Sequence, residues 1–134
     1  MNDIVATFAC VAMQELDKSQ NKRKIIGNIY RKELTNLNKV KLLNYKKDRT
    51  PNYQIFPVHV KNREKFAKYM WSNNVQVNIN NRRNDAYSIF GGIDISLKNL
   101  KRADDDVILI PLHLDLKKKD IYKIIDLVKK FDKI

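Results

Sequence analysis

The chain has 134 residues, of which 43% are hydrophobic and 31% charged, so its composition excludes a disordered or collagen-like protein. Its length suits a single compact domain. Lys and Arg outnumber Asp and Glu by 27 to 15, and the net charge of +12 makes a polyanion a partner to consider. The lysines are nevertheless scattered beside apolar positions, as on solvated faces, and no nucleic-acid motif accompanies them. We therefore expect no specific nucleic-acid partner.

The number of cysteines and the hydropathy of the chain indicate in which cellular compartment the protein is expected. The lone Cys10 excludes an internal disulfide, and no Cys/His cluster has the spacing of a zinc site, so no metal ligands are predicted. The apolar stretch from Ile4 to Met13 is short and leads into a charged helix, so it predicts neither a secretory signal nor a membrane span. These features favour a cytoplasmic protein.

The first 37 residues are predicted to be helical. From Asp3 to about Leu16, apolar residues cover most of the helical circumference, so this helix must be buried on several sides. Asn2 or Asp3 can cap its first turn. A second, one-sided amphipathic stretch runs from Ile25 to Leu37 and is compatible with a continuation of the first helix.

Residues 38–134 predict a small α/β unit in which helices pack against a sheet, and the whole chain is treated as one domain. The strand-like run that contains Pro57 favours a sheet edge or a bulge, because proline cannot donate to a ladder. In chain order we expect a short extended piece at 40–43, a strand at 53–60, a helix at 63–72, a strand at 75–79, an irregular stretch at 80–106, a strand at 107–112 and a helix from about 119.

The long irregular stretch is the candidate site, because loops of that length in small domains are usually functional or disordered. Arg82 and Arg83 offer planar forks for phosphate or carboxylate, and Asn84 and Asp85 follow them. The alternative is that the arginines form surface ion pairs. His113, at a predicted strand end beside a loop, is better placed for a site than a histidine within a strand. No combination of these residues predicts a catalytic centre.

Three separated segments resemble the C-terminal third of the DegT/DnrJ/StrS family of sugar aminotransferases. The opening Met1-Asn2-Asp3-Ile4-Val5-Ala6 resembles the start of a family helix, and the run from Asn21 to Leu34 resembles its continuation. The run from Asn52 to Val58 is similar to the family's "xYHLFPV" strand, and residues 110–121 are similar to its "LPLHPxLTxEDI" segment. The stretch Arg82-Arg83-Asn84-Asp85 resembles the "HRRND" variant of some members.

The resemblance implies the small C-terminal domain of a fold-type-I aminotransferase, with a long N-terminal helix and about three strands packed by helices. It implies an intact enzyme that uses pyridoxal phosphate to aminate a keto-sugar nucleotide and works as a dimer with shared active sites. Arg82, Arg83, Asn84 and His113 would then contact substrate, and Asn2 the cofactor. The family's cofactor lysine belongs to a large domain that precedes these segments, so we expect this chain by itself to be inactive and to bind no cofactor.

Two partners would complete such a chain through its first helix: a large domain, to which residues 1–37 would link, or a second copy. Two other classes of protein stay open at this point. One is a non-catalytic association module derived from the family, and the other is a basic nucleic-acid-binding protein.

Overall fold

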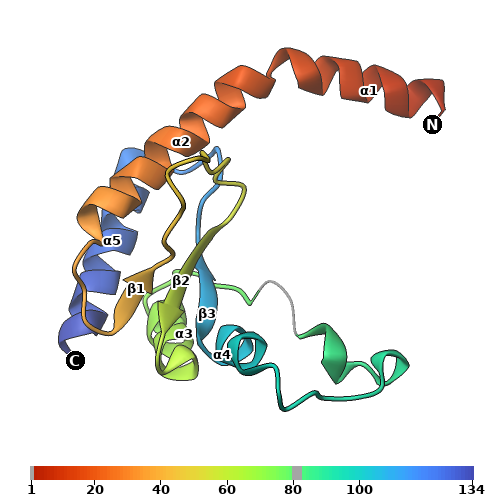
Figure 1. Ribbon diagram of the computed structural model, residues 1–134. Helices are drawn as coiled ribbons and strands as arrows, with labels where there is room; N and C mark the ends of the chain where they lie inside the picture. The colour runs from red at the N-terminus through yellow and green to blue at the C-terminus, as the bar shows by residue number, and fades with distance from the viewer. Residues whose placement is uncertain (1, 80–82) are drawn as a thin grey trace.

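The computed structural model describes residues 2–79 and 83–134, which contain five α-helices and one three-stranded antiparallel sheet (Figure 1). The small sheet of three strands packed by helices, predicted from the sequence, is confirmed. The α-helices are α1 (Asp3–Gln14), α2 (Leu16–Glu33), α3 (Arg63–Ser72), α4 (Lys98–Asp106) and α5 (Lys118–Lys133). The strands are β1 (Val40–Leu42), β2 (Phe56–Val60) and β3 (Val107–Ile110), and two 3-10 turns are η1 (Asn84–Ala86) and η2 (Ser88–Phe90).

The two N-terminal helices follow one another with a single break at Glu15, where the axis bends and α1 leaves the body of the molecule (Figure 1). The Oδ1 atom of Asn2 caps α1 by accepting a 2.9 Å hydrogen bond from the backbone N–H of Val5. The several-sided burial expected of α1 is not provided by this chain, because α1 has no buried residue. Phe8, for example, is 73% exposed.

The sheet has the order β1-β2-β3, so β2 is its central strand. This corrects the expectation that Pro57 lies in an edge strand or a bulge, since Pro57 pairs with Leu109 of β3. The proline is tolerated because β1 is only three residues long and its pairing with β2 ends at Val58. Beyond that point the β1 side of β2 is an open edge, where the missing N–H breaks no ladder.

One face of the sheet forms the core. Residues of β2 alternate between buried and half-buried, and the buried set belongs to one hydrophobic core with residues of α2, α3 and α5. Tyr30 of α2 is fully buried, and its hydroxyl donates a 2.8 Å hydrogen bond to the carbonyl of Pro111. Phe66 of α3 meets Phe131 of α5 edge to face, with 5.0 Å between ring centroids. The opposite face of the sheet is contacted by α4.

The C-terminal helix also holds the start of β1. The Asp132 carboxylate accepts hydrogen bonds from three successive backbone N–H groups, those of Asn38 at 2.9 Å, Lys39 at 2.6 Å and Val40 at 3.2 Å. Its pKa is lowered, because these hydrogen bonds outweigh desolvation by burial, which acts in the opposite direction. A carboxylate in the last turn of α5 therefore fixes where the edge strand begins.

Two expectations for the second half of the chain are wrong. Residues 75–79 do not form a strand, although Val75 and Val77 are buried as the alternation predicted, and only an isolated bridge joins Asn78 to Leu109. The stretch 80–106 is not irregular throughout, because α4 occupies its last nine residues. Two charge pairs at i,i+4, Lys101–Asp105 and Arg102–Asp106, support this helix, which has no apolar stripe of the usual kind.

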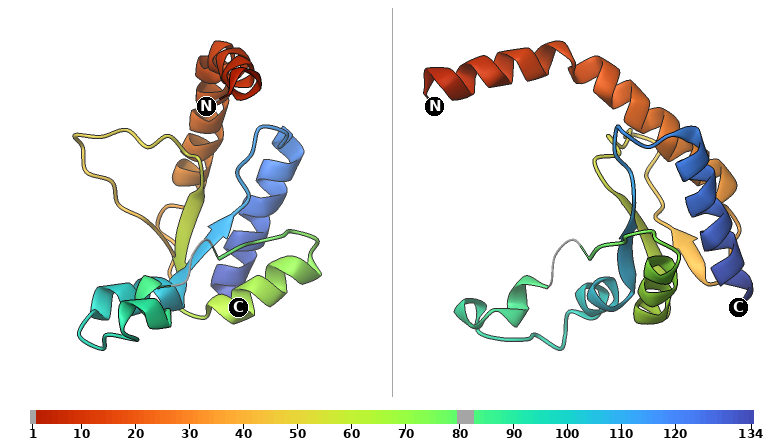
Figure 2. Two further views of the ribbon diagram at one scale, coloured as in Figure 1. Left: turned by 90° about the vertical axis from the view of Figure 1, so that its right-hand side faces the viewer. Right: turned by 180° about the vertical axis from the view of Figure 1, so that it is seen from behind.

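The segment 83–97 and α1 project from the same side of the molecule, one at each end of the sheet (Figure 2). Both carry exposed apolar side chains: Ile4, Val5, Phe8, Val11 and Met13 on α1, and Tyr87, Ile89, Phe90, Ile93 and Ile95 on the segment. No helix within residues 2–79 or 83–134 is both long and apolar enough to cross a membrane.

Candidate functional site

The central feature of the projecting segment is a buried ion pair. Arg83 is 8% exposed, and its Nε and Nη2 atoms donate to the two carboxylate oxygens of Asp85 at 2.6 and 2.5 Å. The same Nη2 donates to the carbonyl of Asp94 at 3.0 Å, so the guanidinium closes the segment on itself. The Arg83–Asp85 pair holds the pKa of Asp85 down at about 2 and raises that of Arg83.

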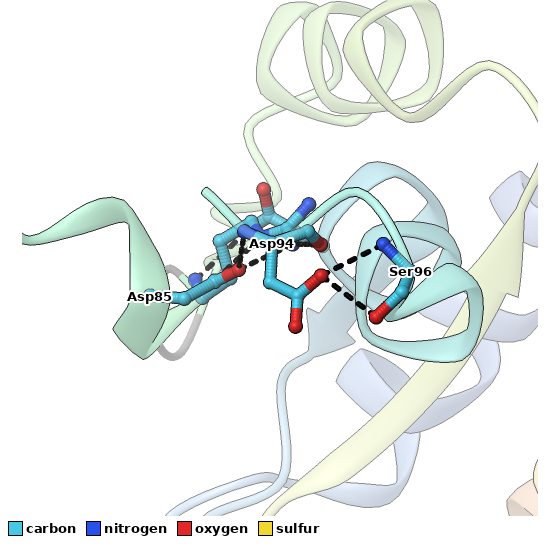
Figure 3. Close-up of polar contacts among 5 residues, drawn as sticks. Asp85, Asp94 and Ser96 are labelled. Carbon is cyan, nitrogen blue, oxygen red and sulfur yellow. Dashed lines mark hydrogen bonds and ion pairs between the residues drawn. The ribbon is translucent and has the colours of Figure 1, made fainter. Parts of the chain in front are cut away.

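Asp94 continues the network toward α4. Its N–H donates to the Asp85 carboxylate at 2.8 Å, and its own Oδ1 accepts from the N–H and hydroxyl of Ser96 at 2.8 and 2.7 Å (Figure 3). The Ser96 side chain is the main cause of the lowered pKa of Asp94. Arg83, Asp85, Asp94 and Ser96 are called the clasp below, because they tie both ends of the segment 83–97 together.

The clasp is fastened to the body of the protein at α4. The backbone N–H of Arg83 donates to Asp104 at 3.3 Å, and Arg63 of α3 donates to the carbonyls of Asp104 and Val107. Between these groups and the sheet is a hollow of about 390 Å³, lined by apolar residues and by Arg83 and Asn84. Asn84 is exposed, so its amide is presented to whatever lies against this side.

His113 lies elsewhere, in the loop that follows β3. It is exposed and lines another hollow, of about 520 Å³, with polar neighbours that include Gln54 and Asn78. Ile55 and Leu109 line both hollows, so the two hollows are neighbours across the outer face of β3. Arg83 and Asn84 flank the start of β3, whereas His113 follows its end.

The structure does not bring the sequence-predicted residues to one point. Asn2 lies at the free end of α1, on the other projection from Asn84. Arg82 lies outside the described residues. The oxygen of Asn2 is used in capping, which leaves the amide nitrogen as a donor for a ligand at the helix start. Any single site that used Asn2, Asn84 and His113 together would need further protein between the projections.

The described lysines can be compared with what a pyridoxal-phosphate site requires. The cofactor needs a lysine whose amine is positioned against the ring and whose pKa is tuned by burial or neighbours. Among the described lysines only Lys129 is even half-buried, and it is paired with Glu33 at 2.6 Å. The other described lysines are exposed. Within the described residues, no lysine therefore has the buried position that such a site requires.

Sequence reasoning missed Asp94, Ser96 and Asp104. The Asp-x-Ser spacing at residues 94–96 is typical of an Asx turn, and that signal was available. The alternation of Lys101 and Arg102 with Asp105 and Asp106 likewise indicated a helix. The alternative interpretation of the arginines as members of surface ion pairs is correct for Arg83 only in the pairing, because the Arg83–Asp85 pair is buried.

Solved structures with the same arrangement include two that are described as sugar aminotransferases or putative ones, CalS13 and Spr1654. AtS13 from Actinomadura melliaura matches with a TM-score of 0.90 at 23% identity, over 97% of this chain and 35% of that one. CalS13 from Micromonospora echinospora matches with a TM-score of 0.82 at 24% identity, over 88% and 32%. The PLP form of the putative sugar aminotransferase Spr1654 from Streptococcus pneumoniae gives 0.85 at 18%, over 99% and 36%. At these identities the likeness shows the fold.

The chain therefore spans about a third of the length of these structures. No curated protein matches it. The model of the DegT/DnrJ/EryC1/StrS aminotransferase family matches residues 1–129, which is nearly the whole sequence. With a matching fold and a family match of this extent, the chain belongs to the DegT/DnrJ/EryC1/StrS aminotransferase family and corresponds to about one third of a family member.

Proposed function

We propose that this chain acts as the small domain of a pyridoxal-phosphate-dependent aminotransferase whose substrates are keto-sugar nucleotides, and that it is not catalytic alone. The observation that most strongly supports this proposal is that α1 and the segment 83–97 project from one side with their apolar residues uncovered (Figure 2). Such surfaces mark interaction sites. A large domain, or a second subunit, seated between the projections would cover both at once. A cytoplasmic location, suggested by the lone Cys10, completes the proposal.

Each site residue has a proposed role in the completed enzyme. Asn84, exposed beside the clasp, donates its amide to the sugar nucleotide, and Arg82, two positions earlier in the sequence, supplies a cation for the diphosphate. Arg83 is a positioning residue in this scheme, because its fork is occupied by Asp85 and holds Asn84 in place. His113 offers a ring nitrogen from the loop after β3, and Asn2 offers its amide to the cofactor phosphate.

The cofactor, when bound in the complete enzyme, supplies the electron sink that makes amino transfer possible. This chain would contribute orientation and exclusion of water, since it carries no buried lysine among the described residues. The purified chain is therefore expected to form no stoichiometric adduct with pyridoxal phosphate. Borohydride reduction followed by peptide mapping tests this. A single lysine modified in full at equimolar cofactor would overturn the proposal of a non-catalytic chain.

The first helix should be the contact through which the chain associates. Each large apolar residue of α1 left in water forfeits about 1.5–3 kcal/mol, so the isolated chain is expected to self-associate or to require a partner. Phe8→Glu should weaken that association, because a carboxylate cannot be buried unpaired. Sedimentation equilibrium measures the effect. Tyr122→Glu, which alters an exposed aromatic of α5, is the matched control and should leave association unchanged.

Two results would contradict this role for α1. A chain that stays monomeric at high micromolar concentration with an ordered first helix would show that the apolar strip needs no cover. Equal weakening of association by Phe8→Glu and Tyr122→Glu would show that association depends on charge in general and not on this helix.

A further inference from the structure

A separate hollow of about 840 Å³ lies on the side of the sheet that carries α4, next to β1. None of Arg83, Asn84 and His113 lines it. Its lining contains four cationic side chains and one carboxylate, Asp106. The four cations are Lys39, Lys41, Lys61 and Arg102.

The fold brings these residues together from three elements. Lys41 of β1 is directly opposite His59 of β2 in the antiparallel register, so the two side chains leave the same face of the sheet as neighbours. That face points away from the core, since Val58 and Val60 on either side of His59 are buried. From α4 come residues 99, 102, 103 and 106, whose spacing places them on one side of a helix.

The positive charge in this hollow is poorly compensated. Arg102 approaches Asp106 only to 3.9 Å, and Lys41 donates to the carbonyl of Leu37 and not to a carboxylate. In the described part of the chain, Lys39, Lys41 and Lys61 form no ion pair. A concave surface lined by one sign of charge concentrates potential and attracts ions of the opposite sign.

A second observation comes from His59. Its Nδ1 atom is buried, and no hydrogen-bond partner for it exists among the described residues. Buried polar atoms usually have a hydrogen-bond partner, so a buried nitrogen without one needs an explanation. Because Nδ1 has no fixed partner, nothing within the described structure sets which ring nitrogen carries the proton. His59 lines the hollow, so a ligand bound there is a candidate hydrogen-bond partner for its ring.

We propose that this hollow binds a small, multiply charged phosphate anion, held by Lys41, Lys61 and Arg102 with a hydrogen bond from the ring of His59. The volume lies within the range of small-molecule sites. Beside the apolar Leu42, Leu43 and Ala103, the polar part of the lining has four cations against one carboxylate, which suits phosphate oxygens. The inference is independent of the proposed aminotransferase role, because it uses none of the residues assigned there.

The test is a titration of the ¹⁵N-labelled full chain with sodium pyrophosphate at constant ionic strength, followed by amide and imidazole NMR signals. We expect saturable shifts confined to the amides of β1, the end of β2 and α4, and to the ring of His59. The double variant Lys41→Gln/Arg102→Gln should weaken binding by about tenfold or more, the loss of roughly one charge-assisted contact. Lys22→Gln/Lys24→Gln, with the same change in net charge on exposed positions of α2, is the matched control and should stay within about twofold.

Three outcomes would overturn the proposal. The first is that both double variants weaken binding alike, which would show attraction by net charge only. The second is that shifts spread over all lysine-bearing faces without saturation. The third is that a single-stranded oligoribonucleotide displaces pyrophosphate and saturates the same signals at far lower concentration, which would assign the surface to RNA. Circular dichroism of each variant verifies that the helices are intact before the comparison is made.

Discussion

The packed body and the two projections contain similar residues in opposite environments. In α3 and α5, apolar side chains at helical spacing are buried, and Phe66 is 0% exposed. In α1 the same kinds of residue are uncovered, and Phe8 is 73% exposed. Helical periodicity therefore identifies a helix and its apolar face, but it does not say whether the cover for that face belongs to the same chain. The difference separates the part that stabilises this chain from the part whose apolar side chains this chain leaves uncovered.

The largest expected effect on stability that tests this comparison comes from a matched pair of phenylalanine truncations. Phe66→Ala removes a buried ring that meets Phe131, and should lower the free energy of unfolding by about 3–5 kcal/mol. Phe8→Ala removes an exposed ring and should change it by less than about 0.5 kcal/mol at concentrations where the chain is monomeric. Urea unfolding at micromolar protein measures both. Similar losses for the two variants would mean that α1 packs within the chain.

A smaller effect is expected at the boundary between the regions, where Tyr53 lies over Gly27 of α2. A Cβ at Gly27 would be 2.4 Å from the nearest atom of the Tyr53 ring, so the ring would have to move. The ring is buried, its hydroxyl bonds Asn28 at 3.1 Å, and its backbone holds a φ of 53°, so movement is costly. Gly27→Ala should destabilise the body by about 1–3 kcal/mol, as measured by thermal and urea unfolding.

The control for the glycine variant is a double-mutant cycle. If the clash with the ring is the cause, Gly27→Ala made in a Tyr53→Ala background should cost much less than it does alone. Additive losses in the cycle would attribute the effect to the helix and not to the ring. Either way α1 should remain helical, since it contacts neither residue.

The smallest expected effect is local and concerns the clasp. The pKa of Asp85 is about 2 in the folded protein against an ordinary 3.8, so its carboxylate stabilises the segment above pH 3.8, and this stabilisation is lost as pH falls through about 2. The amide signal of Asp94, which donates to Asp85, should follow that titration. In Asp85→Asn the titration should vanish, while unfolding of the body changes little.

The contrary result for the clasp would be informative as well. If Asp85→Asn lowered the stability of the body as much as a core truncation does, the segment 83–97 would belong to the body, and the distinction between the two regions would fail. Far-ultraviolet circular dichroism across the same pH range shows whether the helices of the body persist while the clasp opens.

Local sequence determined most of the individual elements. Helix α3 begins at Arg63 and ends at Ser72 as its periodicity predicted, and Asn62 caps it through the N–H of Lys65. The position of a helix and its cap depend on residues within one or two helical turns, so a short stretch of sequence is enough to predict them. The family resemblance could also be recognised from the sequence, because it rests on short runs of residues in the right order.

Tertiary structure alone decided the features that join distant residues. The Asp132 carboxylate reaches the N–H groups of residues 38–40, and Pro57 is tolerated in a central strand only because β1 ends at Leu42. In the candidate site, the sequence pointed to Arg83 and Asn84, but the partnership of Arg83 with Asp85 and Asp94 depends on how the segment folds back. Hydrogen bonds of this kind are set by the packing of whole elements, which local patterns do not specify.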